Sequence, residues 1–518
     1  MSGGNGAVAA GHPATAAAAA TILREGGNAF DAVLAAMATA CVAEPVLCSL
    51  GGGGFLLARP KDGEVRVYDF FAQTPLHRPP DEGRDFHPVL CDFGATQQEF
   101  HIGMASMATP GLVKGLFEVN DELGRMSIKT VIEPAVAAAR DGVVLNRLQA
   151  YIFDVVGPIY MSTAGSRAIF ESRDRPGELV GEGGVIANRR FADLLDILAL
   201  EGADLFYQGE VAARVAADSA QQGGTLSRAD FEAYELIRRA PLDLTYGDAR
   251  VFTNPPPSTG GLLIAFALEL LRGARLGDFG SLEHLSTLVD VMALTNEARL
   301  ETKMHEAPPG AAAARLLDGR LVQAYRSRLA GHPKAYRGTT HVSVVDADGS
   351  AASLTLSNGE GCGYVIPDTG VMMNNMLGEE DINPHGFHAW PVDTRMSSMM
   401  APSLVVDGDG RITALGSGGS NRIRTAILQV LVNLFGFGHD IADAVTRPRL
   451  HFERDVLNME PGFAPEAVDA LAADVGQAKL WPELNLFFGG VHLVRADLHK
   501  QHFEGVGDPR RGGVALSP

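Results

Sequence analysis

The sequence predicts a protein of mixed class, α/β or α+β, in which helices pack against a β-sheet. Two helical segments follow one another between residues 13 and 44. Alternating apolar and polar residues, which are typical of strands, occur near residue 66 and again after residue 340. With 518 residues, of which 46% are hydrophobic and 20% charged, the chain can bury one large core or several smaller ones.

The two N-terminal helices have recognisable ends. The first is expected over Pro13–Arg24, because proline suits a first turn, alanines favour a helix, and two glycines follow it. The second begins with Asn28 or Asp31 as its N-cap and ends before Pro45.

The rest of the chain is predicted more coarsely. After glycines 51–54, the run FLLA and then EVRVYDFF predict strands that enter a sheet. Residues 110–335 are mostly helical in pattern, interrupted by a rigid loop over residues 254–261. A loop-to-strand junction is expected beside Gly338.

A β-hairpin is expected after this junction. Two alternating runs flank the sequence DADG at residues 346–349, which suits a type I turn completed by a left-handed glycine. Counting outward from a three-residue loop places apolar pairs on one face of the hairpin. The pairs on the other face are Ser343 with Ser353, His341 with Thr355, and Thr339 with Ser357.

The polar face of this hairpin needs an explanation, because each buried hydroxyl requires a hydrogen-bond partner. We expect this face either to be wet or to line a site. Thr339 stands at its open end, opposite Ser357. Taken alone, however, a threonine at the start of a strand is usually structural.

Charge and composition restrict the partners. The chain carries 62 Asp+Glu against 43 Lys+Arg, a formal charge of -19, which repels the phosphates of nucleic acid. The four cysteines lack CxxC spacing and are expected to be free thiols. The N-terminus lacks a basic signal region, and no run reaches the ~18 apolar residues of a membrane span. We therefore expect a cytoplasmic protein with no membrane or nucleic-acid partner.

Other motifs are interpreted as structural. Residues 51–54 lack the GK[ST] ending of a phosphate loop and are expected to allow close packing. Residues 346–349 and 407–410 resemble the start of a calcium loop but lack its final glutamate, and both predict hairpin turns. Two histidine pairs lack further ligands, so that no metal or cofactor is predicted. These pairs are His385 with His388 and His499 with His502.

A series of short motifs, taken in order along nearly the whole chain, resembles the gamma-glutamyltransferase family. The motifs are GHP at 11–13, GGNAFDA at 26–32, LGGGGF at 50–55, TPG at 109–111, PPPSTGG at 255–261, TTH at 339–341, NNM at 374–376, SSM at 397–399, GSGG at 416–419 and DPR at 508–510. That family belongs to the N-terminal-nucleophile hydrolases. The resemblance therefore implies an α+β fold built as a four-layer αββα sandwich with a largely helical periphery.

The same resemblance implies that the precursor cuts itself between Gly338 and Thr339. The products are a large subunit, 1–338, and a small subunit, 339–518, which remain one intertwined domain. Whether two such heterodimers associate is left open by the sequence.

The catalytic roles follow from the resemblance. Thr339 would be the nucleophile, with its freed α-amine as the base. Ser357 falls where the family places a hydroxyl that hydrogen-bonds the nucleophile. Gly418 and Gly419 resemble the glycine pair whose N–H groups stabilise the tetrahedral intermediate.

The residues that would bind substrate match the family less evenly than the catalytic residues do. Ser397 and Ser398 look like the serines that bind a substrate carboxylate. Asn358 and Glu379 are weaker matches, because the segment after the second hairpin strand is shorter here than in the family.

One position departs from the family. Members that act on gamma-glutamyl compounds bind the α-carboxylate of the substrate with an arginine, and Phe71 stands in its place. An aromatic ring cannot replace that charge-assisted contact. Glutathione is therefore expected to be a poor substrate, although Gln73 or Arg78 could supply another partner for the carboxylate.

The sequence thus predicts a self-processing enzyme that hydrolyses a small-molecule amide, or transfers its gamma-glutamyl or related acyl group to water or an amine. One alternative is an acylase that never accepts gamma-glutamyl donors. A second is an inactive relative that is used for binding.

Overall fold

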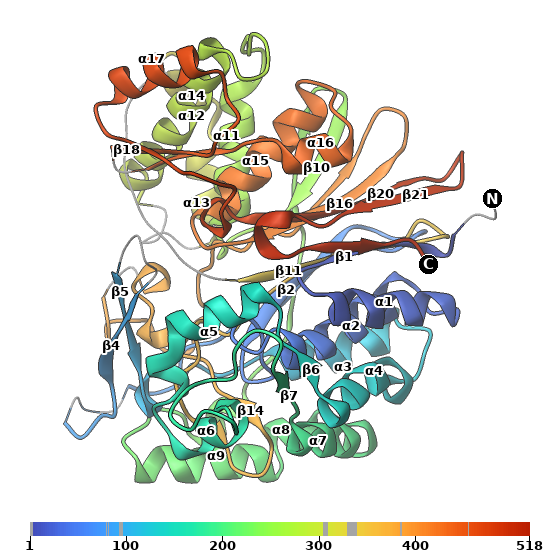
Figure 1. Cartoon of the computed structure of the whole chain (residues 1–518), viewed down its shortest axis with the longest axis vertical. Coiled ribbons are helices and arrows are strands. Elements are labelled where there is room, and N and C mark those ends of the chain that lie inside the picture. The colour runs from blue at the N-terminus through green and yellow to red at the C-terminus, as the bar shows by residue number, and fades with distance from the viewer. Residues whose placement is uncertain are drawn as a thin grey trace.

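Two β-sheets pack face to face, and helices cover both outer faces, in a computed structural model of the chain (Figure 1). The structure describes residues 4–78, 80, 82–92, 97–303, 309–328, 339–383, 386–453 and 455–518. Gly338 and His385 lie outside the described residues. The four layers, helix, sheet, sheet and helix, confirm the predicted αββα sandwich.

The first sheet has seven strands. In spatial order they are β22 (Val514–Leu516), β1 (Gly6–Ala10), β11 (Thr340–Asp346), β12 (Ala351–Ser357), β2 (Gly53–Arg59), β3 (Arg66–Phe70) and β8 (Ile237–Arg239). Helices α1 (Pro13–Arg24), α2 (Ala29–Ala43) and α3 (Leu112–Leu123) pack on its outer face. Helix α4 (Ile128–Asp141) packs on α1 and α2, and α7 (Arg189–Glu201) packs on α4.

The second sheet has six strands. In spatial order they are β21 (His502–Val506), β20 (Gly490–Asp497), β16 (Ile412–Gly418), β15 (Ser403–Val406), β10 (Ala249–Thr253) and β9 (Leu242–Tyr246). Helices α11 (Gly260–Leu271), α15 (Arg422–Phe435) and α16 (Ile441–Thr446) cover its outer face, with α12 (Leu282–Glu301) beyond them.

The remaining elements surround this sandwich. They are β4 (His87–Asp92), β5 (Gln97–Ile102), β6 (Val143–Val144), α5 (Arg147–Tyr160), α6 (Ala164–Phe170), β7 (Val185–Ile186), α8 (Asp204–Tyr207), α9 (Glu210–Gln221), α10 (Arg228–Glu232), α13 (Pro309–Leu316), α14 (Gly319–Arg326), β13 (Val365–Ile366), β14 (Val371–Met372), β17 (Leu450–Glu453), β18 (Val456–Met459), α17 (Pro465–Val475) and β19 (Ala478–Leu480).

Two parts of the central prediction are corrected. Strands β9 and β10 fall within the segment that was expected to be mostly helical, and they complete the second sheet. The loop expected over residues 254–261 is shorter, because α11 already begins at Gly260.

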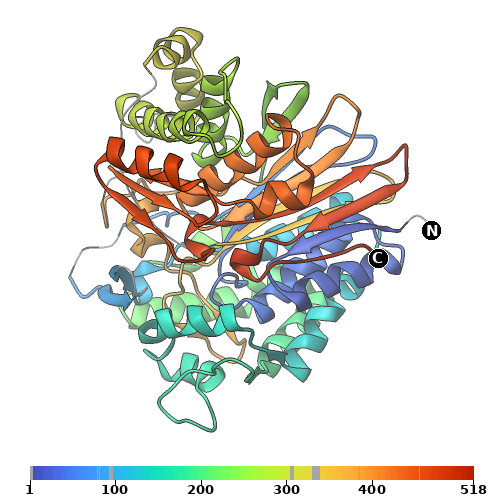
Figure 2. The same cartoon turned by 45° about the horizontal axis from the view of Figure 1, so that its top comes forward.

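Both sides of the predicted cut contribute to both sheets. Residues before 329 supply β1, β2, β3 and β8 to the first sheet and β9 and β10 to the second, while residues from 339 onward supply the other strands. The first and last strands of the chain lie side by side, as Figure 2 shows, because β1 pairs with β22. A break beside Thr339 would therefore leave the strand pairings of both sheets in place, although the cut itself stays a prediction.

Helix α2 begins with a capping box that uses both predicted residues. The side-chain oxygen of Asn28 accepts hydrogen bonds from the N–H groups of Phe30 and Asp31, at 2.8 and 2.9 Å. Asp31 in turn accepts from the N–H of Asn28 at 2.9 Å. The amide of Asn28 also donates to the carbonyl of Leu123 at 2.7 Å, which ties α2 to the end of α3.

We expect Asn28→Ala to lower the free energy of unfolding by about 2 kcal/mol, because it removes a buried cap and leaves the Leu123 carbonyl without that donor. Chemical denaturation would measure the loss. Ser127→Ala removes the exposed cap of α4 and is the control, with an expected loss of about 1 kcal/mol or less. Equal losses for the two variants would show that the tie between α2 and α3 contributes nothing.

The hairpin of β11 and β12 has the predicted register. Ser343 pairs with Ser353 and His341 pairs with Thr355. The pairing ends at Thr340 with Leu356. The next predicted pair, Thr339 with Ser357, lies just beyond this end of the ladder. Both predicted turns are also confirmed, since Gly349 and Gly410 have φ angles of +89° and +78°.

The polar face of this hairpin corrects an expectation. Most of it is neither wet nor part of a site, because it is buried against the second sheet. Ser353 donates to the carbonyl of Leu415 at 2.9 Å, and Ser343 donates to the carbonyl of His492 at 3.2 Å. The backbone of the second sheet thus satisfies these hydroxyls.

Close packing and free thiols are confirmed. A methyl group on Gly53 would lie 2.7 Å from the carbonyl oxygen of Phe70, so the glycine run lets neighbouring backbones approach. All four cysteines are free and buried. Among the described helices, none is long and apolar enough to cross a membrane.

Candidate active site

Thr339 immediately precedes β11, at the point where the first sheet meets the end of β16 in the second. The residue is only 4% exposed. Arg511 donates from Nη1 to its carbonyl oxygen at 3.0 Å. Gly418, the last residue of β16, lies against the same carbonyl, and a methyl group there would overlap the oxygen. The fold therefore brings the predicted nucleophile and the predicted glycine pair together.

The glycine pair leads from β16 into α15. Gly419 has a φ of +118°, a conformation that side chains disfavour, and α15 begins at Arg422. The N-terminal end of α15, which carries the positive end of the helix dipole, therefore follows the glycine pair by three residues. Such an arrangement suits an oxygen that becomes negatively charged during a reaction.

A buried glutamate supports the residue after Thr339. Glu44, at the C-terminal end of α2, accepts hydrogen bonds from Thr340 at 2.6 Å and from Thr15 at 2.8 Å. Burial raises the pKa of Glu44, while these two hydrogen bonds and the charge of Arg511 lower it.

A cavity of about 10 Å³, large enough for about one water molecule, lies beside these groups. It is lined by Gly11, Glu44, Leu47, Leu148, Thr339, Thr340, His341, Gly418, His492 and Arg511.

The two histidines near Thr339 are neutral at pH 7. Burial lowers the pKa of His492 to about 4, and burial together with the nearby His492 lowers the pKa of His341 well below its usual range. Hydrogen bonds to neighbouring groups hold the imidazole ring of each histidine in place. His341 bonds Thr355 and Ser343, and Nδ1 of His492 accepts from the N–H of Asp508.

Ser357, Asn358 and Glu379 form the second part of the predicted site. Ser357 accepts a hydrogen bond from the N–H of Gly359 at 3.1 Å, and a methyl group on Gly359 would overlap a carboxylate oxygen of Glu379. Asn358 is buried, and among the described residues neither polar atom of its side chain has a hydrogen-bond partner. An unpaired buried amide is unusual and indicates a place where a ligand can bind.

This second part is linked to the glycine pair. The hydroxyl of Ser420 donates to Asp381 at 3.2 Å, and Asp381 follows Glu379 by two residues. The segment that carries Glu379 therefore reaches the residue after Gly419, which places an acidic side chain near both parts of the site.

The two predicted carboxylate-binding serines lie against the proline-rich loop. Ser397 donates to the carbonyl of Pro257 at 3.0 Å, and Ser398 accepts from the N–H of Met400 at 3.0 Å. The carbonyl of Ser398 accepts from Ser258 at 2.9 Å. The hydroxyl of Ser397 is thus already donating to the protein.

Phe71 is part of the hydrophobic core. Its residue is 1% exposed, and its ring stacks on Phe55 with the ring centres 5.3 Å apart. Its carbonyl accepts a hydrogen bond from Tyr234 at 2.8 Å. The ring therefore does not line an open pocket.

The polar residues near Phe71 are engaged elsewhere. Gln73 donates to Asp393 at 2.7 Å, and Arg78 donates to the carbonyl of Trp390. A buried arginine that the sequence did not single out, Arg395, is held by Asp69 at 2.7 Å. Neither proposed replacement for the missing arginine is therefore free to bind a carboxylate in this conformation.

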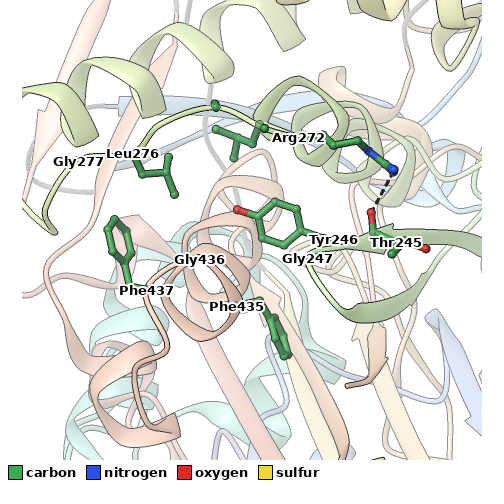
Figure 3. Close-up of a pocket in the computed structure, with 12 residues that line it drawn as sticks. Thr245, Tyr246, Gly247, Arg272, Leu276, Gly277, Phe435, Gly436 and Phe437 are labelled. Carbon is green, nitrogen blue, oxygen red and sulfur yellow. Dashed lines mark hydrogen bonds between the residues drawn. The ribbon is translucent and has the colours of Figure 1, made fainter. Parts of the chain in front are cut away.

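A larger pocket, of about 460 Å³, lies away from Thr339 at the ends of α11 and α15 (Figure 3). Tyr246 and Phe437 line it, and Arg272 turns toward Thr245, to whose carbonyl it donates at 2.9 Å. It shares no residue with the cavity at Thr339. Over the described ranges, no group of three or more side chains could hold a metal ion.

Comparisons with known proteins agree with this geometry. Residues 15–517 match the family described as gamma-glutamyltranspeptidase. The glutathione hydrolase proenzyme of Escherichia coli is 30% identical over 497 residues, which cover 87% of this chain and 82% of that protein. The acylase ACY 1 proenzyme of Pseudomonas sp. strain SE83 is 30% identical over 490 residues, which cover 90% and 86%.

A solved structure shows the same fold. The cephalosporin acylase from Bacillus halodurans superposes with a TM-score of 0.86 over 99% of this chain and 96% of that one, at 22% sequence identity.

Proposed function

Because this chain belongs to the gamma-glutamyltranspeptidase family, which is a family of enzymes, we propose that it is a self-processing amide hydrolase with Thr339 as its nucleophile. The observation that carries the proposal is the contact of the Thr339 carbonyl with Gly418, which ends β16 four residues before α15 begins. No other described threonine or serine that the sequence singled out combines such a glycine pair with the start of a strand.

Self-processing needs only the groups beside Thr339. Its hydroxyl attacks the carbonyl carbon of Gly338, the peptide C–N bond breaks, and the chain is held as an ester on the Thr339 oxygen. Water then hydrolyses the ester. The products are a carboxylate on Gly338 and a free α-amine on Thr339, in keeping with the proenzymes among the relatives.

Turnover uses the new amine. The α-amine accepts the hydroxyl proton while the oxygen attacks the substrate amide, and the N–H groups at Gly418 and Gly419 stabilise the resulting oxyanion. The proton passes to the leaving amine, and water or another amine then releases the acyl group. Ser357 orients the nucleophile, and Asn358 and Glu379 contact the acyl group.

The test of this proposal is the mass of the purified protein. We expect two fragments, 1–338 and 339–518, the second with the N-terminal sequence TTHV. An uncut chain that still hydrolyses amides would refute Thr339 as the nucleophile. An uncut, inert chain would favour the inactive binding protein. Association of two heterodimers and a cytoplasmic location stay predictions.

The acyl group is expected not to require an α-carboxylate, because Phe71 is buried and Gln73 and Arg78 are engaged. Three p-nitroanilide donors separate recognition of the amine from recognition of the carboxylate. The gamma-glutamyl donor carries both groups, the glutaryl donor carries the carboxylate alone, and the valeryl donor carries neither. We expect kcat/KM for the valeryl donor to equal or exceed that for the gamma-glutamyl donor.

A preference of more than about 100-fold, or about 2.7 kcal/mol, for the gamma-glutamyl over the valeryl donor would mean that another group binds the carboxylate, if the glutaryl donor shares that preference. The glutaryl donor is the control. It carries the carboxylate without the amine, so a gamma-glutamyl preference that the glutaryl donor does not share would come from the amine, and Glu379 would be its partner.

A further inference from the structure

Two successive arginines near the C-terminus point in different directions. Residues Pro509–Arg511 form a short 3-10 turn that Asp508 caps by accepting from the N–H of Arg510 at 3.0 Å. Arg510 reaches Glu460, with Nε 2.7 Å from Oε1, whereas Arg511 reaches the carbonyl of Thr339. The turn therefore places a guanidinium beside the proposed nucleophile.

The charges around the first arginine are balanced. Arg510 pairs with Glu460 at 2.5 Å, and Arg449 pairs with Asp508 at 2.7 Å. Arg511 is different, because no carboxylate of the described residues lies within ion-pair distance of it. It is 6% exposed, and its Nε has no hydrogen-bond partner in the described part of the chain.

Arg511 nevertheless stays charged. Burial lowers its pKa to about 10, while Asp508, Glu360 and Glu44 act at longer range to raise it. This pKa is still well above neutral pH. The site therefore contains a buried positive charge that no direct partner neutralises, which is costly unless it acts on something nearby.

Glycines make room for this side chain. A methyl group on Gly490 would lie 2.5 Å from Cδ of Arg511, and methyl groups on Gly418 and Gly419 would lie 3.1 Å from its two terminal nitrogens. The guanidinium is thus enclosed between Thr339 and the glycine pair, where substrate chemistry would occur.

We propose that Arg511 is a positioning residue that holds the carbonyl of Thr339 and, by its positive charge, keeps the freed α-amine of Thr339 in the neutral form that accepts protons. This inference rests on the proposed function, since it requires Thr339 to become N-terminal. The amine and the carbonyl are attached to the same Cα, so a cation 3.0 Å from the carbonyl oxygen also lies close to the amine. A nearby like charge disfavours the ammonium form.

The charged groups around Thr339 determine whether the pKa of its α-amine is raised or lowered. Glu44, from the end of α2, Glu360, after β12, and Asp508, before the 3-10 turn, carry or can carry negative charge and favour the ammonium. His341 on β11 and His492 on β20 are neutral. Arg511 is therefore the cation that opposes these carboxylates at Thr339.

The experiment is the pH dependence of kcat/KM, measured on processed protein whose fragments have been counted by mass. An ordinary α-amine titrates near 7.7–8.0, so only about a tenth to a fifth is neutral at pH 7. We expect the acid limb of the wild type to have its midpoint below about 7.7. Arg511→Gln keeps an N–H donor but removes the charge, and should raise the midpoint by about one pH unit.

Activity of Arg511→Gln should accordingly fall by a factor of about three to eight at pH 7 and recover near pH 9. Arg511→Lys keeps the charge and should keep the wild-type midpoint. Arg495→Gln removes a partly buried arginine from β20 and is the matched control, with an unchanged profile expected.

An acid limb that Arg511→Gln leaves in place would overturn the inference. If that variant does not fold, the wild type decides, because a midpoint at or above about 7.7–8.0 also overturns it and a lower one supports it. Failure of the proposed function is recognised separately. In that case the mass of the protein shows no fragment that begins at Thr339, whatever the pH profile.

Discussion

Thr339→Ala is expected to leave the chain uncut and to reduce amide hydrolysis by a factor of about 10⁴ or more. The loss is this large because one hydroxyl performs both reactions in the proposed mechanism, and removing a nucleophile removes the covalent pathway as a whole. Intact mass would detect the uncut chain, and release of p-nitroaniline from the preferred donor would measure the rate. The variant should fold, since the side chain is small and lies just before the first residue of β11.

Neighbouring substitutions identify which threonine acts. Thr340→Ala removes the hydroxyl that donates to Glu44, and should lower stability by about 1–2 kcal/mol while the chain is still cut. Thr339→Ser keeps a hydroxyl and should be cut and active, at a reduced rate. If Thr339→Ala were cut and Thr340→Ala were not, the nucleophile would be one residue further along the chain.

The elements that the sequence predicted well are those fixed by local chemistry. Helix α1 has the predicted bounds because proline and glycine mark its ends. The register of β11 and β12 follows from one turn, since the turn sets every later pair. Thr339 and Gly418 could be placed in one site only through the resemblance, because 79 residues separate them in the sequence.

The features that the sequence missed depend on distant partners. The sequence predicts that the polar face of the hairpin of β11 and β12 is wet or functional, but the carbonyl of Leu415 in the other sheet satisfies Ser353. Glu44 lies 296 residues from its partner Thr340, and nothing local distinguishes it from a surface glutamate. Arg511 directly follows the DPR motif, yet only the fold shows that it turns toward Thr339.

Because of the same long-range geometry, adding a single methyl group at Gly418 should greatly reduce both self-cleavage and kcat. In Gly418→Ala the new methyl group would overlap the carbonyl oxygen of Thr339, so the ends of β16 and β11 must move apart. In the proposed mechanism, the N–H groups of the glycine pair would then no longer face the oxyanion. Misplacing one such donor typically costs about 10²–10³ in kcat.

We therefore expect Gly418→Ala to be cut slowly or not at all, and its processed fraction to lose at least about 100-fold in kcat with a smaller change in KM. Gly410→Ala is the matched control. It lies in the turn before the same strand, at a φ of +78°, and should lose about 1 kcal/mol of stability without loss of kcat. Since both variants weaken one strand, an equal loss of kcat would mean that the strand, and not the contact with Thr339, supports catalysis.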